Sequence, residues 1–253
     1  MDLKAQGLKA LVTGGTRGIG RAIVETFLNE GVDVSFCARS ADAVEETSQA
    51  LAGRGAHVHG STVDVGDAVA LSSWVEASAK RMGGIDIVVS NVSALAIPDT
   101  DENWEMSINV DLLGTVRLVK AAMPYLEKSS AASIVTVSSV SGREVDFASG
   151  PYGTVKTALV AYTQGLAFQL ADKGIRANTV SPGNTYFEGG VWESIKHGDP
   201  ALFATALGLN PTGRMGTPQE MAAAVVFLAS PISSFTTGTN LVVDGALTRG
   251  IHL

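Results

Sequence analysis

Thr13-Gly14-Gly15-Thr16-Arg17-Gly18-Ile19-Gly20 is the stretch from which the fold of this chain is inferred. It follows the apolar run Ala10-Leu11-Val12 and opens a segment in which Ile19, Ile23 and Phe27 recur at helical spacing. Glycines at positions 14, 18 and 20 permit positive φ and let backbone N–H groups approach a phosphate at the N-terminus of the helix. Glycines also end strands for structural reasons, so the place of this turn between strand and helix carries the prediction.

Short, almost continuous apolar runs alternate with helical patterns along the rest of the chain. The runs span residues 10–12, 32–38, 85–90, 133–138, 175–181 and 240–243. Such runs are typical of parallel strands that are covered on both faces. The repeated alternation predicts one α/β domain over residues 1–253, with right-handed crossovers and a doubly wound parallel sheet. His57 and His59 are read as an exposed strand edge.

Residues from about 184 to 212 interrupt this alternation with glycines, prolines and aromatic side chains. Either this is an ordinary surface excursion, or it is a lid over the carboxyl ends of the strands, where open α/β sheets bind ligands. Its length and aromatic content favour the substrate lid.

Composition excludes several classes of protein. The net charge of −7 among 253 residues argues against a nucleic acid or an anionic membrane as partner. The single cysteine, Cys37, can form no intramolecular disulfide and fits a buried strand position. No signal peptide, membrane span or metal-ligand spacing of the four histidines is recognised, so we expect a cytoplasmic protein without a metal.

A second motif lies near the middle of the chain, where Tyr152 and Lys156 are four residues apart. On a helix this spacing places phenol and ammonium on one face, and a nearby cation favours the phenolate. Ser139, from another element, could hold a carbonyl oxygen against the phenol. A tyrosine–lysine pair alone is more often an ordinary surface pair, but beside the glycine-rich turn it predicts proton transfer next to a bound dinucleotide.

The residues at the end of the second predicted strand indicate which dinucleotide the site binds. An NAD site usually has an acidic residue there for the ribose 2′-hydroxyl. Here Ala38 is followed by Arg39 and Ser40, which suit a 2′-phosphate, and Arg17 could add a second cation. Arg39 could also be a solvated charge, but NADP(H) is preferred over NAD(H).

Together these motifs resemble those of the classical short-chain dehydrogenase/reductase family over essentially the whole chain. The matching pieces are Thr13-Gly14-x-x-x-Gly18-x-Gly20, Asp64, Asn91, Asn109, Ser139, Tyr152-x-x-x-Lys156, Pro182-Gly183 and Val243-Asp244-Gly245. The resemblance implies a Rossmann-type fold and hydride transfer between a nicotinamide cofactor and an alcohol or carbonyl. It also implies a homotetramer or homodimer, formed through helices at about 105–128 and 149–172.

Carried over residue by residue, the resemblance makes Tyr152 the proton donor in ketone reduction, with Ser139 orienting the substrate oxygen. Lys156 is expected to bind the nicotinamide ribose and favour the phenolate, and Asn109 to support a water relay to that lysine. The expected cofactor-binding residues are Gly14, Thr16, Arg17, Gly18, Ile19, Gly20, Arg39, Ser40, Asp64, Val65, Asn91, Tyr152, Lys156, Pro182, Gly183 and Thr185.

Two positions depart from the family pattern. Ser93 replaces a glycine that lets adenosine approach closely, and Phe187 replaces a threonine that contacts the carboxamide. Thr185, two residues before Phe187, is the expected substitute for that contact.

The sequence indicates the substrate less clearly than it indicates the fold, the cofactor or the catalytic residues. Ser141, Glu144, Val145, Tyr186 and Trp192 are expected to border its pocket, a mainly apolar set that favours an uncharged, fairly hydrophobic alcohol or ketone. A 3-oxoacyl-[acyl-carrier-protein] reductase is the main alternative, because such enzymes share these motifs. A non-catalytic NADP-binding regulatory protein is a further alternative, but it would be expected to have lost one of the four catalytic residues.

Overall fold

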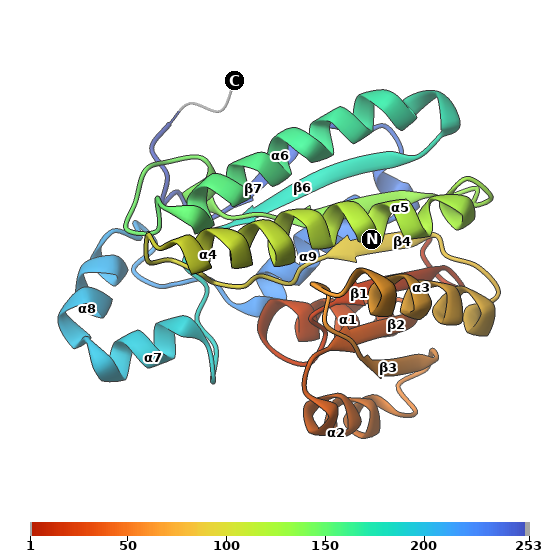
Figure 1. The fold of residues 1–253 in the computed structure, drawn as a ribbon, viewed down its shortest axis with the longest axis horizontal. Coiled ribbons are helices and arrows are strands. Elements are labelled where there is room, and N and C mark those ends of the chain that lie inside the picture. Colours follow the sequence, from red (N-terminus) through yellow and green to blue (C-terminus); the bar gives the residue numbers. More distant parts are fainter. Residues whose placement is uncertain (1, 251–253) are drawn as a thin grey trace.

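Parallel strand pairing dominates the architecture, as the apolar runs predict. The computed structural model describes residues 2–250. Within them, seven strands form one parallel sheet in the order β3-β2-β1-β4-β5-β6-β7 (Figure 1). The strands are β1 (Lys9–Thr13), β2 (Asp33–Ala38), β3 (Val58–Thr62), β4 (Ile87–Ser90), β5 (Ser133–Val137), β6 (Arg176–Pro182) and β7 (Asn240–Val243).

Six of these strands coincide with the expected apolar runs to within two residues at each end. The seventh, β3, has the polar sequence Val58-His59-Gly60-Ser61-Thr62 and pairs only with β2, at the edge of the sheet. His59 therefore lies in an edge strand, whereas His57 lies just before it. An edge strand is partly solvated, so it lacks the continuous apolar character of the central strands.

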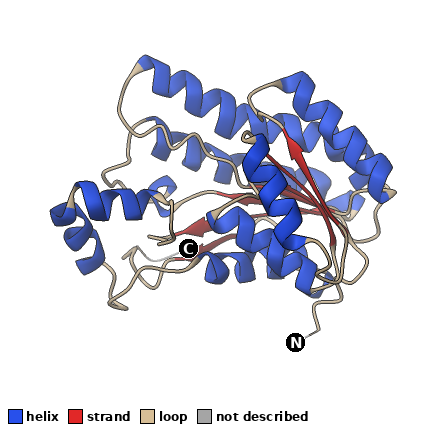
Figure 2. Cartoon of the chain, turned by 90° about the horizontal axis from the view of Figure 1, so that it is seen from below, coloured by secondary structure: helices blue, strands red, loops and turns tan. Residues whose placement is uncertain are grey.

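Helices cover both faces of the sheet (Figure 2). Their bounds are α1 (Gly18–Asn29), α2 (Ala41–Leu51), α3 (Ala68–Met82), α4 (Asp101–Met106), the π-helix η1 (Ser107–Leu113), α5 (Gly114–Leu126), the 3₁₀ turn η2 (Val140–Gly142), α6 (Pro151–Leu170), the 3₁₀ turn η3 (Ala171–Lys173), α7 (Val191–Gly198), α8 (Pro200–Gly208), α9 (Pro218–Ala229) and the 3₁₀ turn η4 (Pro231–Ser233). Helices α1, α2 and α9 pack on one face, and α3, α5 and α6 pack on the other. The sheet is thus doubly wound, as predicted.

Each face of the sheet has its own apolar core. Phe27 of α1 and Phe36 of β2 are fully buried in the first core, and Leu118 of α5 is buried in the second. Cys37 belongs to the second core, and burial raises the pKa of its thiol to about 12. This thiol is therefore a packing residue, as its apolar neighbours in the sequence predict.

The strand order reverses between β1 and β4, because β2 and β3 lie on one side of β1 and β4 to β7 on the other. In open parallel sheets this reversal creates a crevice at the carboxyl ends of the strands. The glycine-rich turn after β1 and the polar segment after β4 both start there. The fold therefore places the sequence motifs at one edge of the sheet.

The segment expected to be a lid contains α7 and α8, which project beyond the carboxyl edge of the sheet (Figure 1). Trp192, Ala206 and Met215 form a small apolar cluster of their own, against which Tyr186 and Phe203 pack. Within residues 2–250, no helix combines the length and the apolar character that crossing a membrane requires.

Candidate active site

A cavity of about 580 Å³ lies at the carboxyl edge of the sheet, and most of the predicted site residues line it. Three of the four predicted catalytic residues, Ser139, Tyr152 and Lys156, line it. The predicted cofactor-binding residues that line it are Gly14, Thr16, Arg17, Ile19, Gly20, Arg39, Ser40, Asp64, Val65, Asn91, Tyr152, Lys156, Pro182, Gly183 and Thr185. Gly18 is the one predicted cofactor-binding residue that does not line the cavity.

The glycine-rich turn requires glycine for two distinct reasons. Gly14 and Gly18 have φ values of 74° and 53°, in the left-handed region. Gly20 has an ordinary φ, but a Cβ there would lie 2.0 Å from the Gly14 carbonyl oxygen and 2.5 Å from Asn91 Nδ2. The turn is thus wound tightly on the first turn of α1. Arg17, the N-cap of α1, makes no side-chain capping hydrogen bond, which leaves backbone N–H groups there for an anion.

Asn91 has a structural contact in addition to its place in the cavity. Its Nδ2 donates to the Thr13 carbonyl oxygen at 3.0 Å, and its backbone N–H donates to Thr13 Oγ1 at 3.0 Å. These bonds join the end of β4 to the end of β1 directly below the glycine-rich turn. Asn91 therefore fixes the two strands that flank the crevice.

Arg39 and Ser40 lie where β2 ends and α2 begins. Both are exposed residues that line the cavity. Ser40 is the N-cap of α2, since its Oγ accepts from the Ala43 N–H at 3.3 Å. Among the described residues, no carboxylate forms a salt bridge with Arg39, so its guanidinium is available to an anionic ligand.

Two glycines allow the turn that carries the predicted catalytic serine to pack closely on the helix that carries Tyr152 and Lys156. A Cβ on Gly142 would lie 2.8 Å from the Lys156 carbonyl carbon, and a Cβ on Gly153 would lie 2.8 Å from the Ser141 carbonyl oxygen. Ser139, the N-cap of η2, is therefore held close to the first turns of α6. Its Oγ accepts from the Ser141 N–H at 3.1 Å, which fixes the hydroxyl.

Tyr152 and Lys156 share a face of α6, as their spacing predicts. Lys156 Nζ lies 5.5 Å from the centroid of the Tyr152 ring. Nζ donates to the Val137 carbonyl oxygen at 3.3 Å and lies 3.1 Å from Asp111 Oδ1. The side chains of Lys156 and Asp111 are each only 2% exposed, so the ion pair is buried.

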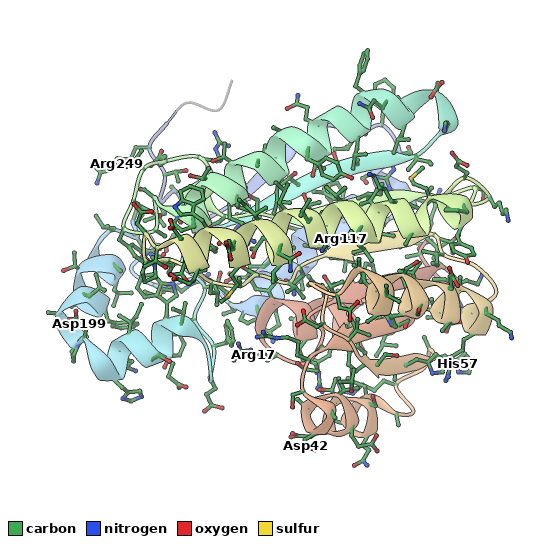
Figure 3. All side chains as sticks on the ribbon, in the orientation of Figure 1. Arg17, Asp42, His57, Arg117, Asp199 and Arg249 are labelled. Atoms are coloured by element: carbon green, nitrogen blue, oxygen red, sulfur yellow. The ribbon has the colours of Figure 1, made fainter. Side chains whose placement is uncertain are left out.

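Asn109 is not at the position expected for it. Its Nδ2 donates to the Gly66 carbonyl oxygen at 3.3 Å, and its Oδ1 accepts from Arg117 Nη1 at 2.8 Å. Figure 3 shows Arg117 on α5. The side chain beside Lys156 is that of Asp111, two residues later, so the structure replaces the expected asparagine with an aspartate.

The helix register explains why Asp111 was missed. Going back from the buried Leu126, Ala122 and Leu118 in steps of three or four leads to Thr115 and Asp111. Asn109 falls outside this buried stripe. The helical register therefore indicates Asp111 from the sequence, whereas residue type alone indicates Asn109.

The five predicted substrate residues divide between the cavity and other contacts. Ser141 and Trp192 line the cavity. Glu144 does not, and its Oε1 instead accepts the N–H groups of Arg249 and Gly250. Val145 is 93% exposed, because the loop turns it outward.

Tyr186 also fails to line the cavity, since its ring packs at 6.2 Å from that of Phe203 in the cluster of α7 and α8. The other residues on this side of the cavity are Leu95, Ile97, Met106, Asp146, Phe147 and Val191.

The segment after Pro182-Gly183 contacts the glycine-rich turn. A Cβ on Gly18 would lie 2.5 Å from Phe187 Cζ, so the aromatic ring rests on that glycine. Arg17 Nη1 donates to the Gly189 carbonyl oxygen at 3.2 Å, and Figure 3 shows Arg17 reaching toward this segment. Thr185 is buried and its Oγ1 donates to the Gly183 carbonyl oxygen at 3.0 Å.

Comparison with known proteins agrees with this geometry. The family model described as Enoyl-(Acyl carrier protein) reductase matches residues 14–248. The chain is 43% identical to isoepoxydon dehydrogenase patN of Penicillium expansum, covering 98% of this chain and 96% of the relative. It is 30% identical to the 3-oxoacyl-[acyl-carrier-protein] reductase FabG of Chlamydia pneumoniae, covering 98% and 100%.

Among solved structures, the chain is similar to a short chain oxidoreductase of Pseudomonas aeruginosa PAO1, described as NADPH-bound and as containing an atypical catalytic center. The TM-score is 0.89 at 32% identity, covering 97% of this chain and 99% of that one.

The tight contact at Gly20 yields a test of the glycine-rich turn. Alanine normally stabilises a helix relative to glycine. Gly20→Ala is instead expected to lower the free energy of unfolding by about 1–3 kcal/mol, because its Cβ collides with the Gly14 carbonyl oxygen. Gly208→Ala, in α8 with no atom within 4 Å of the added Cβ, is the matched control and should change it by less than about 1 kcal/mol. Urea unfolding measures both, and a Gly20→Ala protein as stable as the control contradicts the packing.

Proposed function

The chain belongs to the short-chain dehydrogenase/reductase family of oxidoreductases, and we propose that it transfers a hydride between NADP(H) and an uncharged, mainly hydrophobic secondary alcohol or ketone. The observation that carries this proposal is that Tyr152, Lys156 and Ser139 line the same cavity as the glycine-rich turn. Proton transfer and dinucleotide binding therefore share one site.

The residues present fit a nicotinamide dinucleotide. The turn at Gly14 and Gly20 has room for backbone only, and the uncapped start of α1 suits a pyrophosphate. Arg39 stands at the end of β2 without a carboxylate partner among the described residues, which suits a 2′-phosphate. When bound, the nicotinamide supplies the hydride chemistry.

The protein's own groups then handle the oxygen and the proton. The Ser139 hydroxyl orients the substrate oxygen, and the Tyr152 phenol donates a proton to it in reduction or, as phenolate, accepts one in oxidation. The Lys156 ammonium, 5.5 Å from the ring centroid, favours the charged phenolate. The Ser139 hydroxyl and the Lys156 ammonium are held by hydrogen bonds and an ion pair, so these two groups need little reorganisation during the reaction.

The walls of the substrate side support an apolar ligand. Leu95, Ile97, Met106, Phe147, Val191 and Trp192 line this part of the cavity. The Phe147 and Trp192 rings meet edge to face, with centroids 5.8 Å apart. Two polar residues, Ser141 and Asp146, line the cavity beside them, and the Ser141 Oγ donates to Asp146 Oδ2 at 2.7 Å. An uncharged ligand with one reacting oxygen suits this surface.

Two relatives suggest specific candidate substrates. The isoepoxydon dehydrogenase, at 43% identity, favours a small alcohol. The 3-oxoacyl-[acyl-carrier-protein] reductase, at 30% identity over nearly the whole chain, keeps a carrier-bound 3-oxoacyl thioester as the second candidate.

Replacement of Tyr152 tests the reaction. Wild-type protein should oxidise NADPH with a hydrophobic ketone, or reduce NADP⁺ with isoepoxydon, and Tyr152→Phe should lower kcat at least about 100-fold because the proton donor is lost. Dissociation constants for NADPH, from fluorescence titration, should agree within about threefold between the two proteins. Turnover retained by Tyr152→Phe rejects the mechanism, and turnover with an acetoacetyl carrier thioester alone selects the second candidate.

Cofactor choice has its own test at Arg39. Arg39→Ala should raise the KM for NADPH about 10- to 100-fold and that for NADH less than about threefold, since only NADPH carries the 2′-phosphate. Arg54→Ala is the matched control, because Arg54 is a surface arginine that pairs with Glu25 and does not line the cavity. Equal loss with both cofactors, or better turnover of wild type with NADH, contradicts the preference for NADP(H).

We further propose that the chain forms a homotetramer, or a homodimer, through α5 and α6. Both helices lie on the same face of the sheet (Figure 1). Phe168, on α6, has 89% of its surface exposed and is the apolar side chain of this helix that a partner subunit would cover. Light scattering should give a molar mass four or two times that of the chain, and Phe168→Glu should lower it. A wild-type protein that stays monomeric at micromolar concentration rejects the proposal.

A further inference from the structure

The buried carboxylate of Asp111 is not used by the mechanism above, although it lies 3.1 Å from the ammonium of Lys156. Its Oδ1 is the one buried side-chain oxygen or nitrogen among the described residues that has no hydrogen bond. The contact between Oδ1 and Nζ is therefore a close charge pair and not a well-aligned hydrogen bond. Burying a carboxylate is costly without a compensating charge, and here the Lys156 ammonium supplies that charge.

The backbone around Asp111 fixes the direction of its side chain. Oδ2 accepts from the Ala94 N–H at 2.8 Å, which leaves Oδ1 toward Lys156. The Asp111 carbonyl oxygen accepts from Thr115 Oγ1 at 2.6 Å, and Thr115 in turn bonds Ser90 Oγ at 2.7 Å. Asp111 is thus tied to the segment that follows β4 and to the end of β4 itself.

The helix geometry at Asp111 is also unusual. Asp111 lies in the π-helix Ser107–Leu113, between the α-helical segments α4 and α5. Such wide turns are rare and are frequently found at functional sites. Here the wide turn is the segment that carries Asp111 to the ammonium.

We infer that Asp111 is a positioning residue for the reaction, which holds the Lys156 ammonium in place and offsets part of its charge at the Tyr152 phenol. This inference rests on the proposed roles of Tyr152 and Lys156. The ammonium alone would favour the phenolate, whereas the carboxylate behind it acts in the opposite direction. Because Asp111 and Lys156 are almost fully buried, solvent screens neither charge effectively.

Other charged groups face the same cavity but are differently placed. They are Asp146 after η2, Asp64 after β3, Arg17 in the glycine-rich turn and Arg39 after β2. Asp146 is bonded to Ser141 and Arg17 to Gly189. None of them is paired with Lys156, so the neutralising charge at the ammonium is that of Asp111.

The carboxylate thus weakens the electric field with which the ammonium favours the phenolate. The protonated phenol is the form that donates to a carbonyl oxygen. The pair of Asp111 and Lys156 therefore suits the site to ketone reduction.

The experiment is a titration of Tyr152 in the folded protein. The chain has four tyrosines, so the phenolate absorbance of each protein is compared with that of the same protein carrying Tyr152→Phe, and the difference reports Tyr152. Asp111→Asn should lower the midpoint of this titration by about one pH unit, because it removes the negative charge and leaves the ammonium. The same shift should appear in the pH dependence of kcat.

Asp86→Asn is the matched control. Asp86 accepts the Lys9 N–H at 2.9 Å and the Ser129 hydroxyl at 2.6 Å, before β4 and away from the cavity. Each aspartate accepts a backbone N–H, so either change can lower Tm by a few degrees, but only Asp111→Asn should move the midpoint. If Asp111→Asn does not fold, Asp111→Ser carries the same expectation.

A midpoint that is unchanged or raised by the Asp111 variant, or lowered equally by Asp86→Asn, overturns the inference. Because the absorbance titration needs no substrate, its failure is distinguishable from a failure of the proposed reaction.

Discussion

A buried ammonium constrains the architecture of the site. Taking an ion out of water costs several kcal/mol unless partners compensate, and Lys156 has only 2% of its side chain exposed. Its partners come from two other elements, the Val137 carbonyl oxygen at the end of β5 and the Asp111 carboxylate in the π-helix. The end of β5, the π-helix and α6 must therefore stay in register for the ammonium to be accommodated. Gly142 allows the turn that carries Ser139 to reach the backbone of Lys156 within this arrangement.

The fold could be predicted largely from the sequence because burial leaves a strong pattern. Central strands covered on both faces are apolar throughout, and the glycine-rich turn has few alternatives once it stands between a strand and a helix. β3 carried no comparable signal, since an edge strand can keep His59, Ser61 and Thr62 beside solvent. The strand order was not predictable in the same way, because it depends on which crossovers pass over which face.

Site residues were predictable where their spacing along the chain determines their geometry. They were not predictable where contacts between distant segments determine it. Tyr152 and Lys156 share a helix face by their spacing alone, and the structure keeps them together. Residue type alone favours Asn109, whereas the buried stripe of the helix points to Asp111. Glu144 and Val145 belong to a loop whose direction is set by distant contacts, such as that of Glu144 with the backbone of Arg249. No local pattern in the sequence encodes such a contact.

The small apolar cluster of Trp192, Ala206 and Met215 has an evolutionary consequence. It is separate from the two cores that stabilise the sheet. Substitutions in α7 and α8 can therefore reshape one wall of the cavity while the packing of the sheet stays intact. Related sequences on this scaffold can therefore differ in ligand through this segment while the proton-transfer residues stay unchanged, because the two parts of the molecule do not share a core.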